Sequence, residues 1–212
     1  FSDLATVISS GGNISLTRDY IQTDSHGQII INKNTNIDGN GHTIDAKEKS
    51  RIFNVSSGVS VTLNNFNFIN GKVTAYGGAI YSNGSITVVN SSFTTIKTTA
   101  QYGAGGAIYS YGDGIVINSS FTNIATGNMG PGGATYFYSS GTVINSSFIN
   151  TSAVNGGAGA IYSYSIVKVI NSTFINTTAA AGGAIGADYS GRVYVTDSTF
   201  INNTATDRGG AT

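Results

Sequence analysis

The stretch that decides the fold is Asn118-Ser119-Ser120-Phe121, which returns with small changes along most of the chain. The other copies are Asn65-Phe66-Asn67-Phe68, Asn90-Ser91-Ser92-Phe93, Asn145-Ser146-Ser147-Phe148, Asn171-Ser172-Thr173-Phe174 and Asp197-Ser198-Thr199-Phe200. The last phenylalanines of successive copies are 25, 28, 27, 26 and 26 residues apart, and a leucine or valine lies two residues before each Asn or Asp. This pattern predicts two short strands joined by a bend at the Asn, because Asn turns a strand sharply. A repeat of this length is typical of proteins built by stacking one small unit.

A second repeated block, Gly-Gly-Ala or Gly-Ala, lies between the first ones. It ends at Ala79, Ala107, Ala134, Ala160, Ala184 and Ala211. In three copies the alanine begins the sequence Ala-Ile-Tyr-Ser, which predicts a third strand. Three short strands in each repeat of about 26 residues make one coil of a parallel β-helix, and stacked coils share one continuous core. We therefore predict an all-β, single-stranded parallel β-helix in which the coils stack about 4.8 Å apart.

The repeated Asn gives this solenoid a predicted ladder. Its members are Asn65, Asn90, Asn118, Asn145, Asn171 and, as the one acid, Asp197. Stacked amides can hydrogen bond from coil to coil, as Asn ladders do in cross-β structures. We expect these amides to be buried and structural.

The first 72 residues differ from the rest, since they hold 12 of the 20 charged residues. Phe1, Leu4, Val7 and Ile8 have helical spacing before Gly11-Gly12, which predicts a short capping helix. We expect one continuous domain, with this helix and irregular first coils over 1–72 and regular repeats over 73–212. The closing Gly-Gly-Ala-Thr repeats the block that elsewhere opens a strand, so we expect a C-terminally truncated piece of a longer protein.

The composition excludes several functions. The net charge is zero and only 9% of residues are charged, so no basic surface for nucleic acid or an acidic membrane is expected. The chain has no Cys, which removes disulfides, thiolate metal sites and cysteine nucleophiles. No apolar run is long enough to insert into a membrane. A β protein with many turns is what remains.

Two sets of motifs resemble known surface proteins. Ile37-Asp38-Gly39-Asn40-Gly41-His42-Thr43-Ile44-Asp45, Arg51-Ile52-Phe53-Asn54 and Phe68-Ile69-Asn70-Gly71 resemble the adhesin-like surface proteins of methanogenic archaea. The Gly-Gly-Ala-Ile strands and Phe200-Ile201-Asn202-Asn203 are similar to repeats of chlamydial polymorphic outer-membrane proteins. The resemblance implies a right-handed parallel β-helix of the pectin lyase-like kind. It also implies an extracellular place on a cell surface and attachment to other cells, hosts or polysaccharide.

An enzyme must also be considered, because right-handed β-helices include polysaccharide lyases and glycosidases. Such enzymes need paired or clustered carboxylates. The repeats offer only isolated acids, and the one dense polar group is Lys33, Asp38, His42, Asp45 and Lys47. We interpret this group as a solvated turn, so we expect no catalytic residues, no metal site and no cofactor. If an active site existed there, mutating Asp38 or Lys47 would abolish activity.

Ten Asn-x-Ser/Thr sequons occur, and four of them belong to the Asn ladder. A buried amide cannot carry a glycan, so the better glycosylation candidates are Asn83 and Asn150.

Tyrosine is the most informative feature for function. The third strand and the residues just after it hold Tyr81, Tyr109, Tyr111, Tyr136, Tyr138, Tyr162 and Tyr164. Residues two apart share a face of a strand. If Ile80, Ile108 and Ile161 point inward, the tyrosines form an exposed strip about four coils long. Two structural interpretations compete with this one: the rings stack only to stiffen a solvated sheet, or the tyrosines lie in the core.

We predict a non-catalytic adhesin that binds a glycan or protein of a host or partner cell through this strip, by many weak contacts. On this view, replacing Tyr109, Tyr136 and Tyr162 by serine leaves the fold intact and abolishes attachment. Two different functions stay open beside adhesion: a β-helix enzyme that acts on polysaccharide, and a purely structural surface spacer.

Overall fold

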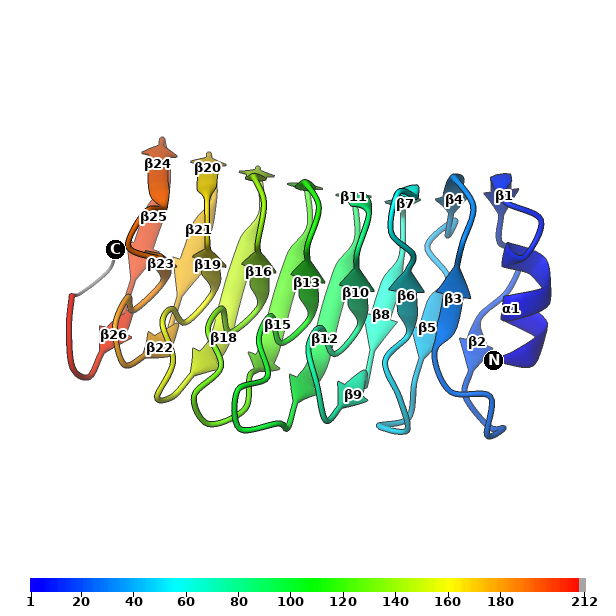
Figure 1. Ribbon diagram of the computed structural model, residues 1–212, viewed down its shortest axis with the longest axis horizontal. Coiled ribbons are helices and arrows are strands. Elements are labelled where there is room, and N and C mark those ends of the chain that lie inside the picture. The colour runs from blue at the N-terminus through cyan, green and yellow to red at the C-terminus, as the bar shows by residue number, and fades with distance from the viewer. Residues whose placement is uncertain (210–212) are drawn as a thin grey trace.

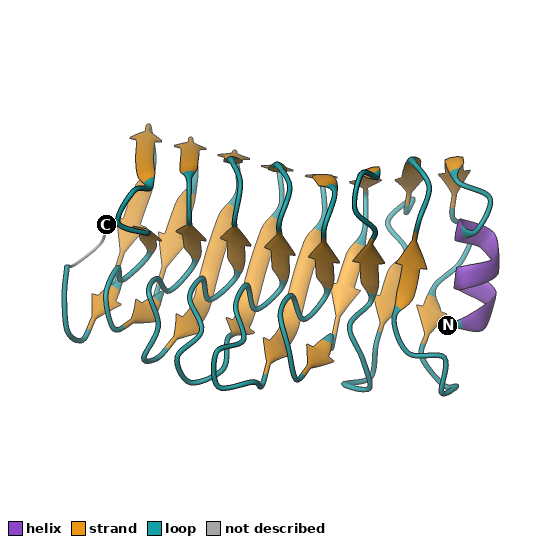
Figure 2. Cartoon of the chain, in the orientation of Figure 1, coloured by secondary structure: helices purple, strands orange, loops and turns teal. Residues whose placement is uncertain are grey.

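The computed structural model describes residues 1–209, and these form one elongated stack of coils with a short helix at its N-terminal end (Figure 1). Almost every element is a short strand (Figure 2). The expected Gly-Gly-Ala copy that ends at Ala211 lies outside the described residues.

The strands form three parallel sheets, here called A, B and C. Sheet A contains β1 (Gly12–Ser15), β4 (Thr35–Asp38), β7 (Ser60–Asn64), β11 (Ser85–Val89), β14 (Gly114–Ile117), β17 (Gly141–Ile144), β20 (Ile166–Ile170) and β24 (Arg192–Thr196). Sheet B contains β2 (Tyr20–Ile21), β5 (Thr43–Asp45), β8 (Asn67–Ile69), β9 (Lys72–Val73), β12 (Ser92–Thr98), β15 (Ser120–Ala125), β18 (Ser147–Ala153), β21 (Thr173–Ile175), β22 (Thr178–Ala179), β25 (Thr199–Ile201) and β26 (Thr204–Ala205). Sheet C contains β3 (Ile29–Ile31), β6 (Phe53–Val55), β10 (Ile80–Ser82), β13 (Ile108–Ser110), β16 (Thr135–Phe137), β19 (Ile161–Ser163) and β23 (Ile185–Ala187).

Each regular coil takes one strand from C, then A, then B, and the next coil pairs with it in parallel. The chain rises through sheet C on the near side of Figure 1 and descends through sheet B on the far side as it moves toward the C-terminus, which is a right-handed winding. This confirms the predicted right-handed parallel β-helix, and it is the handedness expected for parallel crossovers.

The core consists of columns of like residues. Phe68, Phe93, Phe121, Phe148, Phe174 and Phe200 are in register through the strands of sheet B. Their rings stack with centroids 4.7–5.0 Å apart. The predicted inward residues of the other sheets, such as Val116 and Ile108, are also buried. The repeat therefore exists because each coil buries its apolar residues against identical ones.

The glycine block is explained by close packing between coils. The first glycine, as in Gly105, has a positive φ of 59°, which a residue with a side chain rarely adopts. The second glycine meets the backbone of the next coil: a Cβ on Gly106 would lie 2.1 Å from the carbonyl oxygen of Gly133. The buried alanine that follows, such as Ala107, then leads into sheet C.

The helix α1 (Ser2–Ile8) confirms the predicted cap. It packs beside β3, and Phe1, Leu4 and Ile8 are buried at the N-terminal end of the core. Val7 was expected on the same apolar face, but it is 39% exposed. Strands β1 to β6 join the same three sheets as the later coils, so cap and repeats form one continuous solenoid.

Candidate functional site

Tyrosines occupy the outward side of sheet C in two columns. Tyr81, Tyr109, Tyr136 and Tyr162 are in register in β10, β13, β16 and β19, and we call them the inner tyrosine column. Tyr111, Tyr138 and Tyr164 each lie two residues farther along, just after the strand, and we call them the exposed tyrosine ladder. The isoleucines between them, Ile108 among them, point into the core, as the tyrosine-strip hypothesis required.

The inner tyrosine column is stacked but largely covered. The rings of Tyr109 and Tyr136 are parallel, with centroids 4.8 Å apart. Both side chains are only 8% exposed, so the expectation that they form part of an exposed strip is wrong. Loop residues that precede sheet C cause this burial: Ala104 packs against the column, and Tyr76 stacks on Tyr109 at 4.9 Å. Burial also raises the pKa of Tyr109 and of Tyr136.

The exposed tyrosine ladder is the accessible part of the strip. Tyr111 is 46% exposed and Tyr164 is 41% exposed. The Tyr138 ring lies between them, with centroid distances of 4.2 Å to Tyr111 and 4.7 Å to Tyr164. The ladder borders a hollow of about 470 Å³ that is also lined by Ser139, Ser165 and Ser190.

The stacking determines which parts of these tyrosines a ligand can reach. Both flat faces of Tyr138 are covered by its neighbours, at interplanar angles of 13° and 2°. A sugar ring therefore cannot stack on Tyr138, and the ladder offers ring edges and a row of hydroxyls instead. The neighbouring Tyr111 side chain raises the pKa of the Tyr138 hydroxyl.

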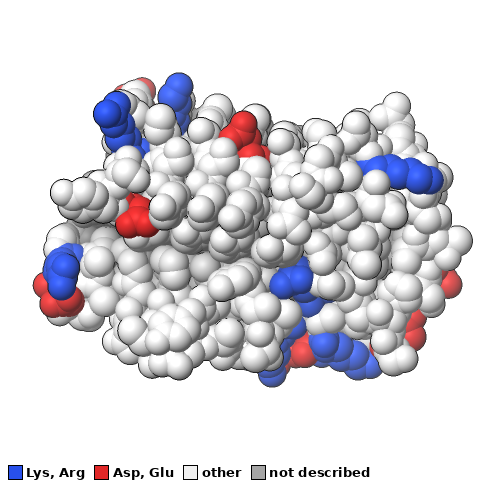
Figure 3. All heavy atoms as spheres, in the orientation of Figure 1, with Lys and Arg blue, Asp and Glu red and all other residues white. Residues whose placement is uncertain are grey.

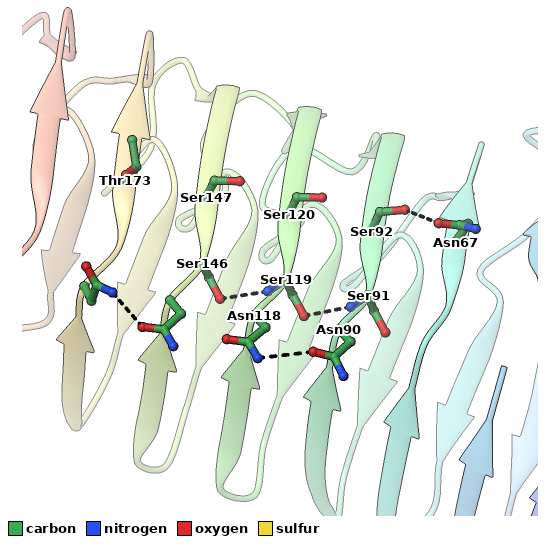
Figure 4. Close-up of a pocket in the computed structure, with 12 residues that line it drawn as sticks. Asn67, Asn90, Ser91, Ser92, Asn118, Ser119, Ser120, Ser146, Ser147 and Thr173 are labelled. Carbon is green, nitrogen blue, oxygen red and sulfur yellow. Dashed lines mark hydrogen bonds between the residues drawn. The ribbon is translucent and has the colours of Figure 1, made fainter. Parts of the chain in front are cut away.

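A second repetitive surface lies at the corner between sheets A and B. The predicted Asn bends are confirmed, because every member of the column has a positive φ between 47° and 56°. Amides bond along the stack from Asn118 to Asn90 at 3.2 Å (Figure 4). Asn171 donates to Asn145 in the same way at 2.9 Å. We expected buried amides, but from Asn90 onward these side chains are exposed, and Asn65 is half-buried, because each side chain points outward from its bend. Together with the neighbouring serines they line a shallow groove of about 560 Å³.

The buried ladder at this corner is made by serine, which sequence reasoning missed. Ser119 is 3% exposed, and its Oγ donates to the Ile117 carbonyl at 2.8 Å. The same oxygen accepts the backbone N–H of Ser91 in the preceding coil at 3.1 Å (Figure 4). Ser146 repeats both bonds one coil later. The signal was present in the sequence, since a serine follows the Asn in five of the six copies.

The glycosylation candidates are both exposed, and Asn150 belongs to a second Asn column. Asn83 lies in the turn between β10 and β11. Asn150 has a φ of 54° and donates to Asn123 Oδ1 at 3.3 Å. Asn176 in turn donates to Asn150 Oδ1 at 3.2 Å. This column went unnoticed, although a Phe-x-Asn spacing repeats along the chain.

The polar group near the cap is not gathered around one point. Asp38 lies at the corner between sheets A and B and accepts from Asn65 Nδ2 at 3.2 Å. Lys47 follows sheet B at the next corner and is 2.9 Å from Asp45. The other two members have their own partners, with Lys33 Nζ on the Ser9 carbonyl and His42 Nδ1 3.1 Å from Asp19. Within residues 1–209 no group of three or more His, Asp or Glu side chains could hold a metal ion.

The lowered pKa of Asp45 predicts that the stability of the protein depends on pH. Its side chain is buried, which raises its pKa, but hydrogen bonds from Asn70 and Lys47 outweigh burial and lower the pKa below its usual value. A carboxyl with a depressed folded pKa stabilises the protein above its unfolded pKa of about 3.9 and loses this effect as the pH falls. We expect Asp45→Asn to melt at a lower temperature than wild type at pH 7, with the difference disappearing in acid. Equal differences in melting temperature at both pH values would contradict this role.

No protein-family model, curated protein or solved structure matches this chain. Among the described residues, no helix has the length and apolar character needed to cross a membrane. The geometry of this chain's own surface therefore has to indicate its function.

Proposed function

We propose that this protein is a non-catalytic adhesin that acts outside the cell, on a cell surface, and attaches through the exposed tyrosine ladder. The observation that carries the proposal is the stacked row of Tyr111, Tyr138 and Tyr164, which borders one hollow and in which the two outer tyrosines are exposed and Tyr138 is half-buried. The partner would be a glycan or a protein on the surface of a host or partner cell.

The rigidity of the row favours binding. Each tyrosine follows a strand of a parallel sheet and is held by its stacked neighbours, so little side-chain entropy is lost when a ligand binds. Tyr is also enriched in protein interfaces because a rigid apolar ring carries a polar tip.

The geometry favours a ligand that extends along the solenoid axis. The tyrosine hydroxyls and those of Ser139, Ser165 and Ser190 can donate to and accept from a polymer that repeats hydroxyl or amide groups. One such contact is weak, but many contacts along one chain, or between two surfaces with many copies, give strong attachment.

The test is the variant Tyr111→Ser/Tyr138→Ser/Tyr164→Ser. We expect a native circular dichroism spectrum and loss of binding when beads carrying the protein are applied to an array of surface polysaccharides and to cells. This combination replaces the variant suggested by the sequence, because Tyr109 and Tyr136 are packed under loops and their loss would also disturb folding.

The matched control is Tyr102→Ser/Tyr194→Ser, which removes two exposed tyrosines outside the ladder. We expect this control to bind as wild type does. If the ladder variant binds as well as the control, the ladder is not the attachment surface. If wild type binds neither array nor cells, the spacer interpretation replaces adhesion.

A further inference from the structure

Half of the basic residues of the chain gather at one edge of the solenoid. They are Lys47, Lys49, Arg51, Lys72 and Lys97. The chain between β5 and β6 meets β9 and the end of β12 there, and Figure 3 shows the basic side chains along the lower edge of the molecule. Two carboxylates lie among them, Asp45 and Glu48. The edge thus has an excess of three positive charges on a protein with a net charge of zero.

A hollow of about 560 Å³ opens at this edge. Its lining includes Gln28, Glu48, Lys49, Ser50, Arg51, Lys72 and Thr74. The charge of Glu48 is shared by Lys72 and Lys97, so Lys49 and Arg51 are the lining cations that form no ion pair among residues 1–209. The hollow therefore combines three cations and one carboxylate with amide and hydroxyl groups that can both donate and accept hydrogen bonds.

Arg51 is a buried cation in this lining and is only 7% exposed. All of its hydrogen-bond acceptors are neutral: its Nε and Nη2 donate to the Tyr76 carbonyl, Nε also to the Gly77 carbonyl, and Nη1 to Gln28 Oε1. One hydrogen on each terminal nitrogen is left over. The guanidinium also lies over the Tyr81 ring, 5.0 Å from its centroid. Among residues 1–209, no carboxylate forms an ion pair with it.

The cations at this edge are not balanced by the carboxylates beside them. Burial lowers the pKa of Arg51 to about 10, so the side chain is still charged at neutral pH. A buried charge without an opposite charge is unfavourable. Lys72 and Lys97 are direct partners in neighbouring strands, where like charges repel, and Glu48 is shared between them at 3.2 and 3.1 Å.

We propose that this hollow binds the carboxylate of an acidic saccharide, with Arg51 and the nearby Lys49 and Lys72 supplying the positive charge. The free Arg51 hydrogens suit a carboxylate, whose two oxygens match a guanidinium. Gln28, Ser50 and Thr74 suit the hydroxyls of a sugar ring, whereas the side chains of an acidic peptide offer only acceptors. This site is separate from the exposed tyrosine ladder and does not depend on it.

The test is calorimetric titration of the whole chain with the tetrasaccharide of galacturonic acid. The comparison ligands are the galactose tetrasaccharide, which has no charge, and a glutamate tetrapeptide. We expect the uronate to bind and to raise the melting temperature. Its affinity should fall at high salt. The neutral saccharide and the peptide should bind at least about tenfold more weakly.

The variant Lys49→Gln/Lys72→Gln removes two charges at the exposed rim and leaves Arg51 in place to hold its loop. We expect it to bind the uronate about tenfold more weakly, while Lys33→Gln/Lys168→Gln, away from the hollow, binds as wild type. Equal binding of both saccharides, equal loss in both variants, or no uronate binding would overturn the proposal. Binding of the peptide alone would overturn the assignment to a saccharide.

Discussion

Phe121→Ala is expected to lower the free energy of unfolding by about 3–5 kcal/mol, the usual range for losing a buried phenylalanine. Phe121 is fully buried, and its ring lies 4.7 Å from both Phe93 and Phe148 at interplanar angles of 3°. Its removal opens a gap between two rings that the backbone hydrogen bonds hold in place, so the cavity cannot collapse easily. Urea denaturation of wild type and variant measures the difference.

The matched control is Phe200→Ala, in the last described coil of the same column. Phe200 stacks on Phe174 at 4.9 Å but is partly exposed, so less apolar surface is lost and we expect a clearly smaller effect. Each coil of a solenoid is stabilised by its neighbours, and an inner gap weakens two interfaces at once. Equal effects of the two substitutions would contradict the stacked column.

The repeat made most of the fold predictable. In a solenoid, each position contacts its own copy in the next coil, so a spacing of about 26 residues in the sequence becomes a contact in space. The Phe column, the bend at Asn118 and the inward Ile108 all follow from this rule. The burial of Val7 was predicted wrongly, because helical spacing does not show how much of the surface of a short capping helix contacts the core.

The candidate site was less predictable, because loops decide which outward residues are reached by solvent. Nothing in the tyrosine spacing distinguishes Tyr109 from Tyr111, yet Ala104 and Tyr76 cover the first and leave the second open. The loops vary in length and sequence from coil to coil, so they carry no repeat signal. The strip hypothesis was therefore right about the sheet and wrong about which tyrosines are accessible.

The basic edge could not be predicted from the sequence, for a related reason. Lys72 and Lys97 are 25 residues apart in the sequence but direct partners in the stack. Charge is scarce in the rest of the solenoid because a repeated charge would repel its own copy one coil away. An edge where cations do stack is thus an exception that suggests a ligand, and it becomes visible only when the register is known.

Gly141→Val is the second substitution with a large expected effect. Two regular coils combine a serine at the end of the sheet C strand with a bulky residue at the start of the sheet A strand, namely Ser82 with Ile86 and Ser163 with Val167. Between them, Phe137 takes the serine position, and glycines take the sheet A position in its own coil and in the preceding one. A Cβ on Gly141 would lie 2.4 Å from Cδ2 of the Phe137 ring, and one on Gly114 would lie 2.4 Å from Cε1.

We therefore expect Gly141→Val to destabilise the protein by about 3 kcal/mol, at the upper end for overpacking, because the buried Phe137 ring has no free space to enter. Phe137→Ser alone should cost about 3–5 kcal/mol through the cavity it leaves. The double variant Phe137→Ser/Gly141→Val restores the sizes found in the neighbouring coil, so it should be more stable than the sum of the two single effects predicts. A coupling of about 1–3 kcal/mol in the double-mutant cycle, measured by urea denaturation, is the expected result. Strict additivity would show that the glycines are there for another reason, and that large and small residues were not exchanged between sheets to keep the core filled.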